Sequence, residues 1–320
     1  MPAFRVLMTD RAWPDATIEK AVLKTVDAEL VEAGTGDEAT LIKLAKDCDA
    51  IATNWAKVTG AVIEAAPKCK TVARLGIGLD NIAVDVATQR KIPVTNVPDY
   101  CIEEVADHAL GMLLAHSRRI AFFHLRTKKG EYNLSATKGL QRLSEQTLGL
   151  VGLGRTAQAL AHRARALGMT VIAHNQSGND YGTGIEMVSL EQLLSSSDYI
   201  SIHAPLTDST RRMFGPAEFA RMRDTAFLIN TSRGGLIDHA ALWVALEQHQ
   251  LAGAALDVFE PEPPDLSQPL FQDERVIVTP HAAFVSEQSL AQMRRQAMEQ
   301  IVAVLKGERP NNVTNPQIYH

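Results

Sequence analysis

The sequence predicts an α/β fold built from two doubly wound parallel-sheet domains. Two observations lead to this prediction. Short apolar runs alternate with helical stretches over two long parts of the chain, and one apolar run ends in a glycine turn that leads into a strong helix former. Such alternation implies βαβ units and therefore parallel sheets, and 320 residues are enough for two domains with sizeable cores.

The first hundred residues contain the first alternating series. Strands are expected at residues 4–9, 29–32, 50–53, 71–75 and 93–96, with helices between them, for example at 17–26, 38–46 and 59–66. This series predicts a small doubly wound domain. A long helix at about 102–119 and an irregular, basic stretch at 120–146 are expected to follow it.

The alternation resumes at Thr147. Six strands are expected, at residues 147–151, 170–174, 199–203, 226–230, 254–257 and 276–279, as a full dinucleotide-binding sheet requires. A last helix at about 286–306 stops at Gly307, and an extended tail at 310–316 is expected to return to the first domain. The predicted domains are therefore a substrate domain, 1–98 with 286–320, and a dinucleotide-binding domain, 99–285. A ligand is expected in the cleft between two such domains.

The glycine turn lies in Thr147-Leu-Gly-Leu-Val-Gly-Leu-Gly-Arg-Thr-Ala157. Gly152 would make the tight turn, Gly154 would let the backbone approach a pyrophosphate, and the small Ala157 would let helix and strand pack. The helix N-terminus then offers free N–H groups to the phosphates. A glycine-rich β-turn is the alternative reading, but the strand before the turn and the helix after it favour a dinucleotide site.

Composition excludes several classes of protein. No segment approaches the ~20 uninterrupted apolar residues of a membrane span, and the N-terminus reads as a strand, not a signal peptide. Three cysteines without paired spacing argue against a disulfide framework or a metal site and fit a reduced cytoplasm. A net charge of −5 gives no bulk attraction to nucleic acid. The basic stretch at 120–146 is expected to be a solvated arm or one that contacts a second subunit, with a nucleic-acid-binding arm as the alternative.

Three stretches at the carboxyl ends of late strands each offer one group suited to a small anionic substrate. Arg233 can bind a carboxylate with two parallel hydrogen bonds. His281 is the natural acid or base near neutral pH, and Glu262 would hold its ring and favour its charged form. Each residue alone has a simpler explanation, as a surface ion pair, a structural histidine or a solvated loop carboxylate. Their common placement beside a dinucleotide turn favours the functional interpretation.

These residues also carry a resemblance. The matching motifs are Arg74-Leu-Gly-Ile-Gly-Leu-Asp-Asn81, Asn96-Val-Pro98, Glu104-Val-Ala-Asp107, Gly152-Leu-Gly154, His203-Ala-Pro-Leu-Thr207, Asn230-Thr-Ser-Arg-Gly-Gly235, Ala255-Leu-Asp-Val-Phe259 with Glu262-Pro263, and Pro280-His281. Over nearly its whole length the chain resembles the D-isomer-specific 2-hydroxyacid dehydrogenase family. Pro280-His-Ala-Ala-Phe-Val-Ser-Glu-Gln288 and the Glu103-Glu104 pair look most like its C-terminal binding protein branch.

The resemblance implies a Rossmann domain inserted in a smaller flavodoxin-like substrate domain. It also implies that NAD(P)H reduces a 2-oxo acid reversibly to a D-2-hydroxy acid. Arg233 would bind the substrate, Glu262 would support His281, and His281 would transfer the proton. Asp257 would hold the nicotinamide amide, and the backbone at Ile77-Gly78 would meet the substrate carboxylate. The family is typically dimeric and pairs through the nucleotide-binding domain.

The full set of predicted site residues follows. Cofactor-binding residues are expected to be Val105, Gly152, Gly154, Arg155, Thr156, Asn175, His203, Ala204, Pro205, Thr231, Ser232, Asp257 and His281. Substrate-binding residues are expected to be Asn54, Trp55, Ile77, Gly78, Arg233, His281 and Phe284.

Departures from the family pattern refine the prediction. Asn175 stands where an aspartate would bind the ribose, and no arginine follows nearby, so use of both NADH and NADPH is expected, with a slight lean to NADPH. The loop Thr53-Asn-Trp-Ala56 lacks the arginine of the phosphoglycerate branch. Trp55 and Phe284 instead favour a 2-oxo acid with an apolar or aromatic side chain. Glu262 replaces the glutamine of formate dehydrogenases, and Ile77 lies where phosphite dehydrogenases have a lysine.

Two alternative functions remain open. One is a non-catalytic, dinucleotide-sensing binding protein of the C-terminal binding protein type, which fold alone does not exclude. The other is a phosphoglycerate dehydrogenase-like enzyme. The intact set of Arg233, Glu262 and His281 favours an enzyme, because a pure sensor needs no proton donor.

Overall fold

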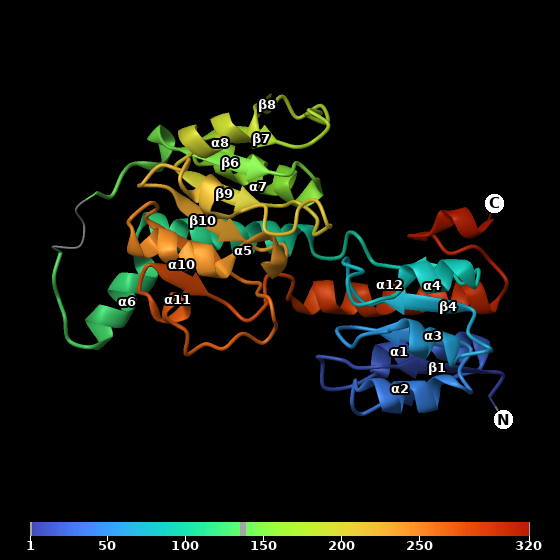
Figure 1. The fold of residues 1–320 in the computed structure, drawn as a ribbon. Coiled ribbons are helices and arrows are strands. Elements are labelled where there is room, and N and C mark those ends of the chain that lie inside the picture. Colours follow the sequence, from blue (N-terminus) through green and yellow to red (C-terminus); the bar gives the residue numbers. More distant parts are fainter. Residues whose placement is uncertain (1, 135–138, 320) are drawn as a thin grey trace. The chain divides into compact units, whose positions relative to one another are not determined.

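The computed structural model describes residues 2–134 and 139–319. The chain divides into two compact units, Met1–Tyr100 with Ser286–His320, and Cys101–Val285 (Figure 1). Each unit contains its own sheet, and every strand pair in both sheets is parallel. The predicted fold class, two doubly wound parallel-sheet domains, is therefore confirmed.

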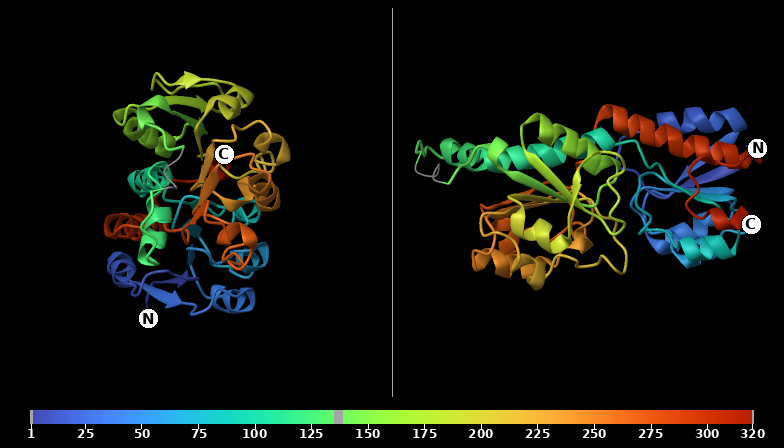
Figure 2. Two further views of the ribbon diagram at one scale, coloured as in Figure 1. Left: turned by 90° about the vertical axis from the view of Figure 1, so that its left-hand side faces the viewer. Right: turned by 90° about the horizontal axis from the view of Figure 1, so that it is seen from above.

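The smaller unit has a five-stranded sheet in the order β2-β1-β3-β4-β5, the order of flavodoxin-like folds. Its strands are β1 (Phe4–Met8), β2 (Ala28–Glu32), β3 (Ala50–Thr53), β4 (Thr71–Arg74) and β5 (Val94–Thr95). Its helices are α1 (Thr17–Leu23), α2 (Glu38–Ala45), α3 (Gly60–Glu64), α4 (Val84–Gln89) and α12 (Glu287–Leu305), with 3-10 turns at Lys24–Val26 and Pro316–Tyr319. Figure 2 shows α1 and α12 side by side on one face of this sheet.

The C-terminal tail returns to the smaller unit, as predicted. Val313 forms an antiparallel bridge with Thr95 of the edge strand β5. The buried Asn315 accepts a hydrogen bond from Val94 N at 2.8 Å and donates one to Ile92 O at 2.9 Å. The tail therefore covers the open edge of β5 and satisfies backbone groups that would otherwise be exposed.

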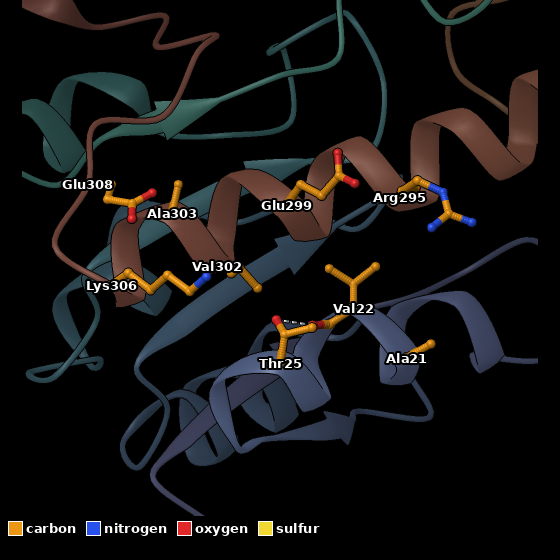
Figure 3. A pocket seen from close by; sticks show the side chains of 9 residues that line it. All are labelled: Ala21, Val22, Thr25, Arg295, Glu299, Val302, Ala303, Lys306 and Glu308. Atoms are coloured by element: carbon orange, nitrogen blue, oxygen red, sulfur yellow. Dashed lines mark hydrogen bonds between the residues drawn. The ribbon is translucent and has the colours of Figure 1, made fainter.

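A surface groove runs between α1 and α12 (Figure 3). It is lined by Ala21, Val22, Thr25, Arg295, Glu299, Val302, Ala303, Lys306 and Glu308. Its charged side chains are of both signs, and Thr25 Oγ1 already donates to Val22 O at 2.7 Å. None of the predicted site residues lines this groove, so it is not the predicted ligand site.

The larger unit has a seven-stranded sheet in the order β12-β11-β10-β9-β6-β7-β8. The strands are β6 (Thr147–Val151), β7 (Thr170–His174), β8 (Glu186–Met187), β9 (Tyr199–Ile202), β10 (Phe227–Asn230), β11 (Gly253–Leu256) and β12 (Val276–Val278). The prediction of six strands was wrong by one, because it missed β8. This edge strand has only two residues, so it shows neither an apolar run nor an alternation that a sequence pattern would reveal.

Helices cover both faces of this sheet (Figure 2). They are α5 (Ile102–Ser117), α6 (Ile120–Lys128), α7 (Arg155–Ala166), α8 (Leu190–Ser196), α9 (Pro216–Phe219), α10 (His239–Glu247) and α11 (Pro269–Gln272), with 3-10 turns at Leu143–Glu145 and Gly234–Leu236. Successive strand residues face opposite cores. Tyr199 packs in the cluster with α5 and α7, and Ile200 packs in the cluster with α8 and α10. The sheet is therefore buried on both faces, as parallel sheets are.

The stretch at 120–146 was expected to be irregular, and this was wrong in part. It contains α6 and a 3-10 turn, while residues 135–138 lie outside the described residues. Arg119, at φ 50°, turns the chain between α5 and α6. None of the residues of α6 is buried. Its apolar residues therefore do not form the buried stripe by which a helix is recognised in a sequence.

His116 of α5 is a half-buried histidine of the larger unit. Its ring stacks on Phe227 at 3.8 Å between centroids, and its Nδ1 lies 3.2 Å from the Tyr199 hydroxyl. Burial, with a smaller contribution from the charge of Arg119, lowers the pKa of His116 to about 4. The imidazole is therefore neutral in the folded protein at neutral pH.

We predict that the larger unit loses stability as the pH falls from about 6.5 to about 4. Above this window His116 is neutral in both states, whereas within it the unfolded chain binds the proton more strongly. A shift of this size favours unfolding by up to about 3 kcal/mol. The thermal unfolding midpoint of His116→Phe should therefore fall less steeply across this window than that of the parent protein. The control is His162→Phe, at an exposed position of α7; equal slopes in both variants would contradict the prediction.

Candidate active site

The glycine turn after β6 has the geometry of a dinucleotide cradle. Gly152 has φ 94°, and a Cβ there would lie 2.8 Å from the carbonyl carbon of His203, so only glycine fits. At Gly154 a Cβ would meet no atom within 4 Å, which leaves open space in front of α7. The helix begins directly after it, at Arg155, and its first N–H groups have no partners within the helix. The turn therefore offers room and donors for a pyrophosphate.

The ends of β9 and β10 supply further polar groups. Ser232 Oγ donates to Ile202 O at 2.8 Å and ties the two strand ends together. The hydroxyl of Thr231 is buried and has no hydrogen-bond partner among the described residues, so it remains available to a ligand. Burial lowers the pKa of His203 to about 4, and its Nε2 lies 2.9 Å from Ser201 Oγ. These residues fit a dinucleotide bound along the strand ends.

The loop after β7 contains Asn175, for which a contact with the ribose was predicted. Asn175 Nδ2 donates to Asn179 O at 2.8 Å, and its Oδ1 accepts from Ser177 Oγ at 3.0 Å. Arg165 of α7 donates to the carbonyl oxygens of Thr183 and Gly184 at the far end of the loop. The near end of the loop, residues 175–179, therefore presents amides and a hydroxyl and no charged side chain.

Arg233 follows β10 and is held by its own turn. Asn230 Nδ2 donates to Arg233 O at 2.9 Å, and Arg233 Nη1 donates to Ser232 O at 2.8 Å. A Cβ at the next residue, Gly234, would lie 2.0 Å from the carbonyl carbon of Phe259. The arginine turn is therefore packed against the segment that leads to the predicted carboxylate.

Glu262 and His281 form a hydrogen-bonded pair. His281 Nδ1 lies 2.7 Å from Glu262 Oε2, while Glu262 Oε1 accepts from Phe259 N at 2.8 Å. Burial raises the pKa of Glu262, but the hydrogen bond and charge of His281, the Phe259 N–H and the charge of Arg233 together bring it below its usual value. An ionised carboxylate only accepts, so His281 Nδ1 carries a proton. Of the two ring nitrogens, Nε2 is then the candidate for proton exchange.

Phe284 packs against the ring of His281, and Asp257 binds the backbone beside it. The Phe284 ring meets the His281 ring edge to face, with 5.9 Å between centroids. Asp257 is fully buried, and its carboxylate accepts hydrogen bonds from Thr279 Oγ1, Ala282 N and Ala283 N. The structure thus brings Arg233, Glu262, His281, Phe284 and Asp257 together at the carboxyl ends of β10, β11 and β12.

Sequence reasoning assigned no role to His108 or Thr279. Thr279 Oγ1 lies 2.5 Å from Asp257 Oδ1 and 3.0 Å from His108 Nε2. The sequence could have singled out Thr279, because it lies two residues before His281. Nothing in the sequence pairs Thr279 with His108, which lies 171 positions away on α5.

The predicted substrate loop of the smaller unit follows β3. Asn54 is 2% exposed and donates from Nδ2 to Leu75 O at 3.0 Å, while its Oδ1 is buried without a partner among the described residues. Trp55 is 49% exposed. The backbone N–H groups of both residues donate to the Asp10 carboxylate, at 3.0 and 2.8 Å. A carboxylate of the chain itself thus occupies the two amides of this loop.

The turn at Ile77-Gly78 lies at the end of the neighbouring strand β4. The buried Arg74 donates from Nε to Gly78 O at 3.1 Å and from Nη1 to Leu75 O at 2.5 Å. Gly76 has φ 147°, and its missing side chain makes room for this guanidinium. Ile77 is 41% exposed. The hydrogen bonds of Arg74 therefore fix the turn, and the side chain of Ile77 reaches the surface of the unit.

The chain matches the family model "D-isomer specific 2-hydroxyacid dehydrogenase, NAD binding domain" over residues 110–283. It is 38% identical over 286 residues to a glyoxylate reductase of Korarchaeum cryptofilum, covering 87% of this chain and 86% of that one. It is 38% identical over 316 residues to a D-3-phosphoglycerate dehydrogenase of Methanocaldococcus jannaschii, covering 97% of this chain and 59% of that one. A solved D-lactate dehydrogenase of Aquifex aeolicus, complexed with NAD and lactic acid, superimposes with a TM-score of 0.88 at 27% identity, covering 97% and 99% of the two chains.

The family model, these relatives and the shared fold identify an NAD(P)-dependent oxidoreductase of 2-hydroxy acids. The chain belongs to the D-isomer specific 2-hydroxyacid dehydrogenase family. The relatives named above are reductases and dehydrogenases of several small acids, so their names do not select one substrate. The likeness to the C-terminal binding protein branch stays a prediction.

We predict that His281 is the acid and base of the reaction. His281→Ala should bind NAD(P)H like the parent protein and turn over ~10²–10⁴-fold more slowly, because positioned proton transfer contributes an effect of that size. Cofactor binding is measured by quenching of tryptophan fluorescence, and turnover by nicotinamide absorbance. His249→Ala, which removes another histidine of the same unit, serves as the control. Near-parental turnover in His281→Ala would remove the assignment.

We predict relaxed cofactor selectivity with a slight lean to NADPH. Asn175 keeps a hydrogen-bonding group near the ribose but lacks the charge that repels a 2′-phosphate, and no arginine follows within residues 176–180 to bind that phosphate. The ratio of kcat/KM for NADPH and NADH should therefore lie near one, and Asn175→Asp should shift it toward NADH. Asn179→Asp adds a charge in the same loop as a control. A strict NADH preference that Asn175→Asp leaves unchanged would assign selectivity to other residues.

Proposed function

We propose that the chain reversibly reduces a 2-oxo acid with an apolar or aromatic side chain to the D-2-hydroxy acid. The observation that carries this proposal is the 2.7 Å pair of His281 and Glu262, with the charge of Arg233 acting on the same carboxylate. A proton donor, a carboxylate that orients it and a cation for an anionic substrate are the groups that reduction of a 2-oxo acid needs.

The residues of the larger unit have distinct proposed roles. A bound NAD(P)H supplies the hydride that reduces the carbonyl carbon. Arg233 binds the substrate carboxylate and stabilises the negative charge that develops on the carbonyl oxygen. His281 Nε2 gives its proton to that oxygen, and ionised Glu262 stabilises the imidazolium beforehand. The ketone thus gains one hydride and one proton and becomes the alcohol; the reverse reaction returns both.

Residues of the smaller unit are proposed to select the substrate by its side chain. From this unit we propose Asn54, Trp55, Ile77 and Gly78 as substrate-binding residues. Trp55 and Ile77 are exposed apolar side chains. The amides of Asn54 and Trp55 are already satisfied by Asp10, and a carboxylate there repels a second negative charge on the substrate. These features disfavour a phosphorylated acid, and with it the phosphoglycerate dehydrogenase-like alternative.

A second candidate substrate class is a small polar 2-oxo acid such as glyoxylate. The likeness to the Korarchaeum cryptofilum glyoxylate reductase favours it, because that relative is matched over most of its length. The chemistry at His281 is the same for both classes. The two candidates differ only in the side chain that the substrate carries.

We predict that phenylpyruvate or a branched-chain 2-oxo acid has a higher kcat/KM than glyoxylate or 3-phosphohydroxypyruvate. In an apolar pocket each added methylene gains ~1–3 kcal/mol until the pocket is full. Trp55→Ala should narrow the difference, whereas Trp243→Phe, in the larger unit, should leave it unchanged. A screen of these acids with both reduced cofactors measures the order. If glyoxylate or the phosphorylated acid is the best substrate, the side-chain assignment fails and the reaction class stands.

We further propose a homodimer that pairs through the larger unit. In and after α6 lie four strongly exposed apolar side chains, Ile120, Leu125, Tyr132 and Leu134, at 57%, 58%, 95% and 76% exposure. Exposed apolar groups of this number mark interaction surfaces.

In the part of the chain that the structure describes, no helix is long and apolar enough to cross a membrane. We propose the cytoplasm as the compartment, because Cys48 and Cys69 are buried thiols outside any disulfide.

A further inference from the structure

His108, Thr279 and Asp257 form a hydrogen-bonded chain behind the His281 loop. Thr279 Oγ1 lies 2.5 Å from Asp257 Oδ1, and His108 Nε2 lies 3.0 Å from the same hydroxyl and 3.6 Å from Asp257 Oδ1. A threonine hydroxyl has one proton, and Asp257 as a carboxylate only accepts. Thr279 therefore donates to Asp257 and accepts from His108, which fixes a proton on His108 Nε2.

The inner end of this chain sets the backbone at His281. His281 N donates to Asp257 O at 2.8 Å, and the Asp257 side chain accepts from Ala282 N at 2.8 Å and from Ala283 N at 2.9 Å. Three consecutive amides thus end on one buried residue. His281 itself has φ 51°, a left-handed conformation that costs a non-glycine residue about 1 kcal/mol and persists only where the surroundings enforce it.

The outer end of this hydrogen-bonded chain, His108, lies on α5. His108 is the seventh residue of this helix, which begins one residue after the larger unit does, and the His281 loop ends where that unit ends, at Val285. The hydrogen-bonded chain therefore joins the first helix of the unit to its last loop. The side chain of His108 is 25% exposed, so a substitution of His108 alters little of the core.

We propose that His108 and Thr279 are positioning residues of the reaction, which orient the Asp257 carboxylate and, through it, the backbone that carries His281. This inference rests on the proposed function, because it assigns the two residues to the proton transfer by His281. Removal of the Thr279 hydroxyl removes one of the hydrogen bonds that fix the plane of the Asp257 carboxylate. The amides of Ala282 and Ala283 then no longer have acceptors in fixed positions. With the imidazole gone, the hydroxyl proton is no longer directed at Asp257 alone.

The proposal predicts a pattern across five variants assayed for 2-oxo acid reduction. Thr279→Val and His108→Leu should each lower kcat about tenfold, since small displacements of reacting groups have effects of this order or larger. Thr279→Ser and His108→Gln keep a hydroxyl and an N–H donor and should restore most of kcat. The double variant Thr279→Val/His108→Leu should be no slower than Thr279→Val alone, because His108 acts only through the hydroxyl.

Controls separate positioning from general damage. His162→Leu replaces an exposed histidine of the same unit and should keep the parental kcat. Thermal unfolding midpoints show whether each variant is folded. A folded Thr279→Val with parental kcat, fully additive losses in the double variant, or a serine variant no better than the valine variant would each overturn the proposal.

A second readout needs no substrate. Carbethoxylation of His281 by diethyl pyrocarbonate, followed by peptide mass spectrometry, reports how its imidazole is held. Thr279→Val and His108→Leu should change this rate several-fold relative to His162→Leu, and Thr279→Ser should restore it. An unchanged rate in Thr279→Val overturns the positioning role, even if no 2-oxo acid proves to be a substrate. Failure of the substrate screen with an altered rate overturns only the proposed function.

Discussion

The candidate site depends on close contact between backbone segments at the strand ends of the larger unit. A Cβ at Gly152 would lie 2.8 Å from the His203 carbonyl carbon, and one at Gly234 would lie 2.0 Å from that of Phe259. Side chains are not found at such distances, so either substitution must displace a loop. At Gly234 the displaced segment is the one whose Phe259 N–H binds Glu262. The absence of two Cβ atoms therefore sets both the width of the dinucleotide cradle and the position of the carboxylate beside His281.

Electrostatics then decides what this arrangement can do. Taken alone, partial burial raises the pKa of Glu262, and a protonated carboxyl would not hold a charged imidazole. The pair with His281, the Phe259 N–H and the charge of Arg233 reverse that tendency and lower the pKa of Glu262. The fully buried Asp257 carboxylate accepts hydrogen bonds from one hydroxyl and two amides. The partly exposed carboxylate of Glu262 thus contacts the ring of His281, and the buried carboxylate of Asp257 binds the backbone beside it.

Much of the fold could be predicted from the sequence, because parallel strands buried on both faces read as short apolar runs. β3, β6 and β7 begin and end at the predicted residues, and most other ends differ by one residue. β8 and α6 were missed for the same physical reason: neither buries a stripe of apolar side chains that leaves a period in the sequence. The candidate site divides in the same way. Arg233, Glu262 and His281 follow strands and carry recognisable chemistry, whereas Thr279 and His108 act through a contact that only the folded chain creates.

Two carboxylates show how the chain separates chemistry from selectivity. Asp257 in the larger unit and Asp10 in the smaller unit both accept hydrogen bonds from consecutive backbone amides, 282–283 and 54–55. The first pair of amides fixes the loop that carries His281, the proposed proton donor. The second pair lies in a loop whose free amides would suit an anionic substituent, and Asp10 occupies them. Under the proposed function, a change at the second pair would alter which acid is accepted and would leave the proposed proton donor in place.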